Sequence, residues 1–209
     1  MSRESQTRKI LTLQFSIVAM NKCMFGCRYA AALCACLLLG VMPAVADADH
    51  QGGALLPGAQ AEILGVYFTP PAGAATAIVQ ALDHSEREVL VQAYGFTHNA
   101  IAQALVRAHQ RGVVVRVLLD DKSSTTNRYV IDRLMQADVV LRLDGKHAIA
   151  HNKVMVIDES VVITGSFNFT NSAATRNAEN FLVLKSHALA LRYKSEWQNH
   201  WGHGRELSQ

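Results

Sequence analysis

Between residues 61 and 201, short runs rich in β-branched residues alternate with segments that carry apolar residues at helical spacing. This alternation is the strongest constraint on the fold, because strands that alternate with helices build a layered sheet with helices packed on it. The expected strands span 61–68, 87–96, 113–120, 139–144, 151–158, 161–164 and 180–185. The expected helices span 73–84, 98–110, 128–137 and 187–201. The sequence predicts an α/β domain with a mixed, largely parallel central sheet and helices on both faces.

Local patterns add three expectations about these elements. The strands at 151–158 and 161–164 are too close for a crossover helix, so they should pair as a hairpin. Thr97 is of a residue type that caps helix N-termini, and it precedes the expected second helix. Trp197 and Trp201 are four residues apart, which favours a core stripe of the last helix over a base-stacking platform.

The first 46 residues have the order of features of a secretory signal. Lys22 and Arg28 precede the uncharged apolar run 30–42, and small residues follow it up to Ala46. The run is shorter than the roughly 20 apolar residues of a membrane-spanning helix. We expect cleavage after Ala46 and a periplasmic or secreted protein with no stable membrane association afterwards. An uncleaved N-terminal anchor is the alternative.

Removal of this segment changes the composition of the chain. All four cysteines lie within 1–46, so the remainder can form neither a disulfide nor a thiolate metal site. Residues 47–60 are rich in Gly and polar residues and are expected to form a flexible lead-in. The predicted functional domain therefore spans 61–209.

The charge balance of the domain gives no general support for nucleic-acid binding. Five of the 20 Lys and Arg and one of the 17 Asp and Glu lie in 1–46, which leaves 15 basic against 16 acidic residues. A nucleic-acid-binding domain is usually basic overall, so attraction to phosphate should be local. A basic rim in loops after strands, or merely solvated charge, is expected from Lys122, Arg128, Lys146 and Arg176.

Residues 151–180 contain the polar side chains that phosphodiester chemistry needs. Side chains two apart on a strand share a face, so His151 and Lys153 should point the same way. Ser166 and Asn168 repeat this spacing after the expected hairpin. Pairing of the two strands would therefore place a nucleophile and several phosphate-oxygen donors on one floor.

Each of these residue types has a chemical reason to be there. Neutral imidazole is nucleophilic at ordinary pH, and a covalent phosphohistidine divides one difficult displacement into two easier ones. Lys153 supplies a positive charge, while Asn168 and Ser166 supply neutral donors for the equatorial oxygens. Glu179 is the candidate carboxylate for orienting the imidazole of His151.

The spacing of these residues is H-x-K-x4-D-x6-G-S-x-N, which resembles the signature of the phospholipase D superfamily at every position. A chance match is expected in fewer than about one chain in 10⁵. The stretches YGFTHNAIAQALVRAHQRGVVVRVLLD, GSFNFTNSAATRNAEN and W-x3-W-x2-G extend the resemblance to the small, secreted, plasmid-encoded endonucleases of this superfamily.

The resemblance implies roles for the motif residues. His151 would be the nucleophile, Lys153 and Asn168 would hold the phosphate, Ser166 would assist, and Glu179 would match the acid that hydrogen-bonds the histidine. The remaining motif residues, which we expect to be structural, are Asp158 and Gly165. For Asp158 the reason is its place on the opposite strand face, beside a turn.

The resemblance also implies a homodimer. Enzymes of the superfamily need two such motifs around one active site, with the second histidine acting as general acid. The segment His98-Asn99-Ala100 resembles the start of a second motif but lacks its lysine. Two copies of His151 facing each other across a two-fold axis would supply the missing acid.

No metal or cofactor is expected. The chain has no H-E-x-x-H, no H-x-H and, after the signal, no cysteine. His147 is expected to be a loop histidine with no role. His187, His200 and His203 are expected to form a solvated helix face and tail.

These observations predict an exported, metal-independent endonuclease that cleaves DNA, with RNA as an open second substrate, and with little sequence preference. The alternative is a phospholipase D or phosphatidyl transferase, although those usually carry two motifs on a longer chain. A non-catalytic module that binds anionic polymers is disfavoured because His151 and Lys153 are both retained.

Overall fold

The computed structural model describes residues 56–71 and 73–207. The predicted signal peptide at 1–46 and most of the lead-in at 47–60 lie outside the described residues, and both remain predictions.

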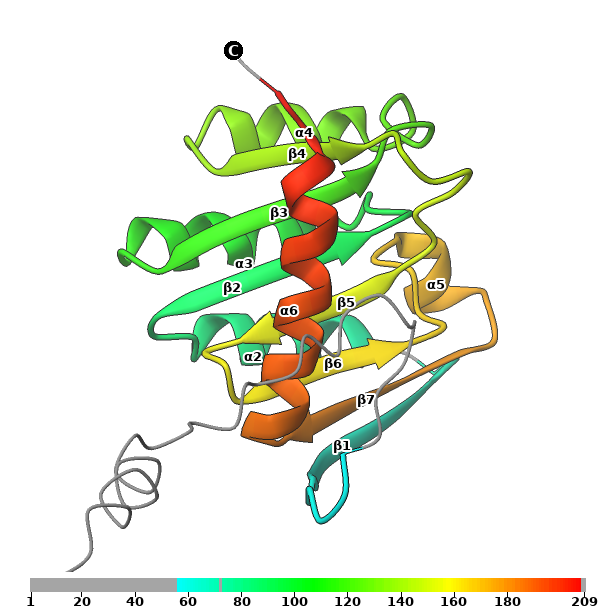
Figure 1. Ribbon diagram of the computed structural model, residues 1–209. Helices are drawn as coiled ribbons and strands as arrows, with labels where there is room; N and C mark the ends of the chain where they lie inside the picture. Colours follow the sequence, from blue (N-terminus) through cyan, green and yellow to red (C-terminus); the bar gives the residue numbers. More distant parts are fainter. Residues whose placement is uncertain (1–55, 72, 208–209) are drawn as a thin grey trace, which may run out of the picture. The chain divides into compact units, whose positions relative to one another are not determined.

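The described chain forms one eight-stranded sheet with the strand order β1-β7-β6-β5-β2-β3-β4-β8 (Figure 1). The strands are β1 Glu62–Thr69, β2 Glu88–Ala93, β3 Val114–Asp120, β4 Val140–Asp144, β5 Lys153–Ile157, β6 Val161–Gly165, β7 Glu179–Lys185 and β8 Arg205–Glu206. The helices are α2 Ala74–Asp83, α3 Asn99–Gln110, α4 Arg128–Met135, α5 Asn171–Thr175 and α6 His187–His203.

The predicted mixed α/β sheet is confirmed, but its parallel part is smaller than expected. Only β2, β3 and β4 pair in parallel, and they are connected through α3 and α4. β5 pairs antiparallel with both β2 and β6, so the expected hairpin is present. β7 is antiparallel to β6 and β1. The connections around β5 are too short for the crossover that parallel pairing requires, which explains the difference.

Two apolar layers hold the helices on the two faces of the sheet. α6 crosses the front of the sheet in Figure 1, and α2, α3 and α4 lie behind it. Alternation along β5 separates the layers: Met155 and Ile157 belong to the layer with α2 to α4, while Val154 and Val156 pack with α6. Side chains alternate between the two faces of the sheet along β5, so the burial of Val154 to Ile157 also determines the face on which Lys153 lies.

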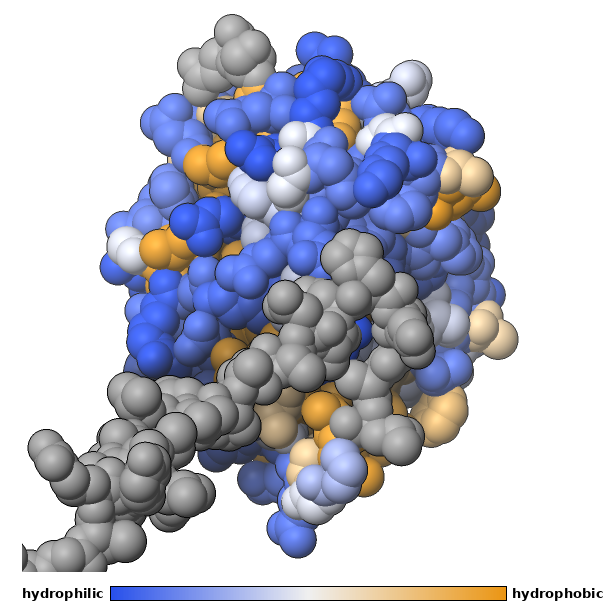
Figure 2. Space-filling view, viewed as in Figure 1, coloured by the Kyte–Doolittle hydropathy of each residue, from blue (hydrophilic) through white to orange (hydrophobic). Residues whose placement is uncertain are grey.

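The edge strand β1 leaves apolar surface uncovered. Tyr67 faces the core and stacks on Phe181 with ring centroids 4.8 Å apart, whereas α6 packs mainly over β2, β4, β5 and β6. Figure 2 shows apolar surface gathered at the end of the sheet where β1 lies. The large apolar residues of β1 that are exposed are Ile63, Leu64, Val66 and Phe68.

Several local expectations can be compared with the structure. Trp197 is buried, stacks on Trp201 and donates its indole N–H to the Val91 carbonyl, so the predicted core stripe is confirmed. The prediction of Thr97 as an N-cap was wrong, because α3 begins one residue later with His98 in that position. The sequence analysis missed α5 and β8, which are too short to show a period. No helix within the described ranges is long and apolar enough to cross a bilayer.

Candidate active site

One open pocket is formed where β5, β6 and β7 meet. His151 and Lys153 come from the start of β5, Gly165 to Asn168 from the end of β6, and Glu179 from the start of β7. The two pairs with the predicted two-residue spacing, His151 with Lys153 and Ser166 with Asn168, therefore line the same pocket. The residues that line this pocket are His151, Lys153, Gly165, Ser166, Asn168 and Glu179.

His151 is exposed, and its ring makes no hydrogen bond with any described residue. Its edge-on contact is with Tyr94, at a centroid distance of 4.9 Å and an interplanar angle of 64°. The next residue is fixed by the backbone, since the Tyr94 N–H donates to the Asn152 carbonyl at 2.9 Å. The histidine is thus held by packing while its nitrogens stay open to a ligand.

Tyr94 is a pocket neighbour that sequence reasoning missed. It is the first residue after β2, and β2 pairs directly with β5, so it lies beside the start of β5. Its ring centroid is also 5.6 Å from Lys153 Nζ. The available signal was its position at the carboxyl end of a strand, where α/β sheets build sites.

Lys153 is almost fully buried, with 8% of the residue exposed. Its Nζ donates to the His151 carbonyl at 2.9 Å. Burial lowers the pKa of Lys153 below its ordinary value, and the negative charge of Glu179 opposes that shift. A buried ammonium of this kind carries spare donors and a strong local field toward a bound anion.

The carboxylate of Glu179 accepts hydrogen bonds from Ser166 and Asn177, whereas His151 was its predicted partner. Its Oε2 accepts the Ser166 hydroxyl at 2.6 Å, and its Oε1 accepts from the Asn177 amide at 3.0 Å. The Ser166 oxygen in turn accepts the Asn180 N–H at 3.1 Å. Among the residues described, no carboxylate reaches the His151 ring, so an orienting role for Glu179 remains a prediction.

Asn168 and Gly165 are the remaining residues that line the pocket. The Oδ1 atom of Asn168 is buried and lacks a hydrogen-bond partner within the described chain, and the Nδ2 donors of the same amide are the groups that can bind a phosphate oxygen. A Cβ on Gly165 would collide with the Asn180 carbonyl oxygen and come 2.6 Å from the Phe181 Cα. Only glycine lets β6 approach β7 this closely.

Asp158 lies outside the pocket, at the turn after β5, where φ is 54°. Its carboxylate accepts the backbone N–H groups of Glu86, Arg87 and Glu88 at 3.0, 2.7 and 2.9 Å. These bonds fix the segment that leads into β2, which gives this motif residue a structural function.

The expected basic rim is only partly available. Arg128 pairs with Asp132 at 2.8 Å, which compensates its charge. Lys122 donates to the Ala148 carbonyl and Arg176 to the Ser172 hydroxyl, so neither is paired with a carboxylate. His98 is not part of the pocket, and burial lowers its pKa.

His200 and His203 are not solvated as predicted. The side chains of His200 and His203 are only 16% and 23% exposed, and with His147 they surround the buried carboxylate of Asp144. The prediction of a solvated helix end was wrong because the last turn of α6 packs over β4 and the loop after it. His187, at the start of α6, is exposed as predicted.

The chain is similar to several known proteins. A family model described as "Cardiolipin synthase, PLD-like domain" matches residues 78–201. The structure of a phospholipase D family member, Nuc from Salmonella typhimurium, aligns with a TM-score of 0.69 and 32% identity over 72% of this chain and 100% of that chain. NucT from Helicobacter pylori aligns with a TM-score of 0.61 at 23% identity and supports the fold alone.

Curated relatives carry phospholipid-related names. A protein named phospholipase D from Rickettsia prowazekii is 45% identical over 62% of this chain and 63% of its own length. A mitochondrial cardiolipin hydrolase from Xenopus tropicalis is 32% identical over 56% of each chain. The match thus spans less than two thirds of the length of these relatives.

Proposed function

The chain belongs to the phospholipase D superfamily, and we propose that it is an exported endonuclease that cleaves DNA through a phosphohistidine formed on His151. One observation carries the proposal. The ring nitrogens of His151 are open to a ligand in a pocket that also holds a buried lysine and the amide of Asn168.

The geometry supports a two-step displacement. A ring nitrogen of His151 attacks phosphorus, and the bond from phosphorus to the leaving oxygen breaks. The charge of Lys153 and the amide N–H of Asn168 stabilise the oxygens of the transition state, while Ser166 donates to Glu179 and holds it in the pocket. Water then attacks phosphorus, the P–N bond breaks, and the histidine is regenerated. None of these steps uses a metal ion.

A homodimer would supply the general acid that the single pocket lacks. The pocket is open, and the exposed apolar surface of β1 extends toward it, because Phe68 and Thr69 lie opposite Asn180 and Glu179 in the β1–β7 register. Burial of such surface between two copies is favourable. We propose that His151 of the second subunit protonates the leaving oxygen and later activates the water.

DNA is the preferred substrate class for two reasons. The pocket is open and the side chains that line it carry polar groups, so its lining residues form no apolar channel for an acyl chain. In addition, the sequence resembles the small endonucleases of this superfamily, and the alignment covers the whole of Nuc. Lys122, Lys146 and Arg176 would supply local attraction for a phosphate backbone despite the neutral total charge. The N-terminal segment 1–46 supports export to the periplasm or medium.

Phospholipid is the second candidate, favoured by the names of the curated relatives and by the exposed apolar residues of β1. A lipid-docking surface needs such residues beside the catalytic pocket. The chemistry at His151 would be unchanged, and only the leaving group and the surface contacts would differ.

The deciding experiment supplies plasmid DNA and vesicles of phosphatidylcholine or cardiolipin separately to the purified protein, in EDTA, with a His151→Asn variant as control. We expect wild-type protein to nick plasmid DNA in EDTA and the variant to leave it intact. Release of headgroup or phosphatidate without DNA cleavage would replace the endonuclease proposal with the phospholipid one. DNA cleavage by the variant at the wild-type rate would refute both.

A further inference from the structure

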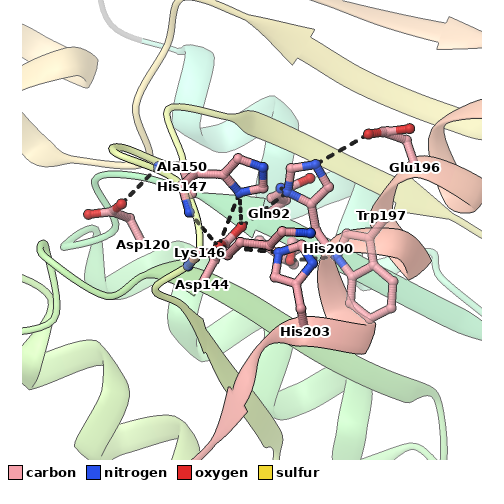
Figure 3. A network of polar contacts seen from close by, with 11 residues as sticks. Gln92, Asp120, Asp144, Lys146, His147, Ala150, Glu196, Trp197, His200 and His203 are labelled. Carbon is pink, nitrogen blue, oxygen red and sulfur yellow. Dashed lines mark hydrogen bonds and ion pairs between the residues drawn. The ribbon is translucent and has the colours of Figure 1, made fainter. Parts of the chain in front are cut away.

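Figure 3 shows a compact cluster of one carboxylate and three imidazoles. None of these four residues lines the active-site pocket. Asp144 ends β4, His147 lies in the loop after it, and His200 and His203 stand three residues apart in the last turn of α6. One donor atom from each residue lies within 4.8 Å of all the others. Segments distant in sequence therefore present four ligand atoms to one point.

The carboxylate of Asp144 is the centre of this cluster. Its oxygens lie 2.9 Å from His147 Nδ1, 3.1 Å from His200 Nδ1 and 3.3 Å from His203 Nε2. The Asp144 side chain is fully buried, while the His147 side chain is 40% exposed, which leaves a path from solvent.

Hydrogen bonds from the histidines to Asp144 do not account for all the ring nitrogens of the cluster. His200 Nδ1 lies within 2.9 Å of the Gln92 amide nitrogen, which is a donor, and it also faces Asp144. A nitrogen that accepts from Gln92 has no proton to give to the carboxylate, and a bound ion would take over the lone pair that Gln92 now uses. His203 Nε2 is buried and has no well-formed hydrogen bond within the described chain. At least these two nitrogens have reason to present lone pairs rather than protons.

A divalent transition-metal ion uses such lone pairs. Zn²⁺ prefers four ligands, takes imidazole nitrogen at about 2.0–2.1 Å and carboxylate oxygen at about 2.0–2.2 Å, and so places its donor atoms roughly 3.4 Å apart. The contacts to Asp144, at 2.9–3.3 Å, are already close to that spacing, and a pair at the 4.8 Å limit needs a contraction of about 1.4 Å. Nitrogen-rich sites with one carboxylate favour zinc and its neighbours over calcium or magnesium.

The surroundings of His200 match the second shell of a metal site. Its other ring nitrogen, Nε2, lies 3.2 Å from the Glu196 carboxylate. Metal-bound histidines usually donate their free N–H to a carboxylate, which fixes the tautomer that coordinates. Figure 3 shows the ring of His200 between Glu196 on one side and Asp144 on the other.

We propose that Asp144, His147, His200 and His203 form a binding site for a structural divalent transition-metal ion of the zinc type. The ion would join the end of α6 to the loop that leads to His151. That loop is already held at Ala150, whose N–H donates to Asp120 Oδ1 at 2.8 Å. The ion takes no part in the cleavage steps, so this inference is independent of the substrate.

The test uses the full chain after EDTA treatment and dialysis, with its four cysteines alkylated so that thiolates cannot compete. Calorimetric titration with ZnCl₂ should show saturation at one ion per chain. His203→Gln should weaken binding at least about tenfold, whereas His187→Gln, on the same helix but outside the cluster, should bind as wild type does. Absence of saturable binding, or equal affinity of the two variants, would overturn the proposal.

A second measurement needs no variant. Hydrogen exchange of the wild-type chain, followed by mass spectrometry with and without Zn²⁺, should show slower exchange in residues 144–150 and 198–204. Protection confined to residues 151–180 would place the ion in the open pocket instead and would contradict the assignment.

Discussion

The loop between β4 and β5 has histidines of opposite character at its two ends. His151 has an exposed ring with no hydrogen bond to the described protein, and the buried Lys153 lies beside it. His147, near the start of the loop, faces a buried carboxylate that it shares with two further imidazoles. A histidine whose nitrogens lack protein partners can act on a substrate, while one whose nitrogen is bound contributes to structure. The residue type alone does not distinguish the two.

Substitution of His151, at the end of this loop, should have the largest effect on the cleavage rate. His151→Asn should lower the cleavage rate at least about 10³-fold, because it removes the nucleophile and, in a dimer, also the acid. His84→Asn, at an exposed helix end, is the control and should cleave at the wild-type rate. A loss of less than tenfold in His151→Asn would place the chemistry elsewhere.

Lys153 should show the next largest effect. Lys153→Met should lower kcat/KM by roughly 10²–10³-fold through loss of transition-state charge stabilisation. The active form is the charged one and burial lowers its pKa, so wild-type activity should fall as pH rises, at a pH below that of an exposed lysine. Lys153→Arg should keep residual activity without this alkaline fall. An unchanged alkaline limb in that variant would assign the limb to another group.

At the start of the same loop, where Asp144 contacts three histidines, we expect substitution to change the stability of the fold. Asp144→Ala should lower the free energy of unfolding by about 3 kcal/mol, because it removes the buried carboxylate that the three imidazoles surround and leaves the backbone N–H of Lys146 without its acceptor. Urea denaturation of the EDTA-treated protein measures this quantity. If the variant were as stable as wild type, the cluster would not be a structural contact.

Asp158 tests whether a motif residue can be structural only. Asp158→Ala removes the acceptor of three backbone N–H groups and should cost about 2 kcal/mol of unfolding free energy. The cleavage rate per folded molecule should stay within about fivefold of wild type. A loss as large as that of Lys153→Met, at unchanged stability, would give this aspartate a direct catalytic role.

The smallest expected effect is at Ser166. Its hydroxyl donates to Glu179 and positions that carboxylate, so Ser166→Ala should reduce kcat by about tenfold or less, or roughly 1 kcal/mol. Steady-state kinetics on a fluorescent oligonucleotide would measure it. A 10³-fold loss would indicate that Glu179, once released, is essential.

Sequence patterns predicted what depends on local periodicity. The strand period places His151 with Lys153 and Ser166 with Asn168, and the short link between their strands requires a hairpin. Glu179 was assigned to the pocket, but its contact with Ser166 rather than His151 depends on side-chain geometry that spacing does not determine.

Contacts between distant segments were not predictable in the same way. Tyr94 reaches His151 only because β2 pairs with β5, and that strand order is a property of the whole sheet. His200 and His203 looked like a solvated tail because Asp144, 56 residues earlier than His200, gives no local signal. The parallel part of the sheet was overestimated because the antiparallel pairing of β5 with β2 and of β7 with β1 joins segments that are distant in sequence, and the short connections around β5 were used only to predict the hairpin.

The most direct test of the account is to trap the covalent intermediate. The protein is mixed with a substrate in excess and quenched in alkali, which preserves phosphohistidine, and the peptides are then analysed by mass spectrometry. The account predicts a nucleotide or phosphatidyl adduct on His151, formed at a rate sufficient for turnover, and none in His151→Asn. Turnover at full rate with no adduct, or with an adduct on another residue, would contradict it.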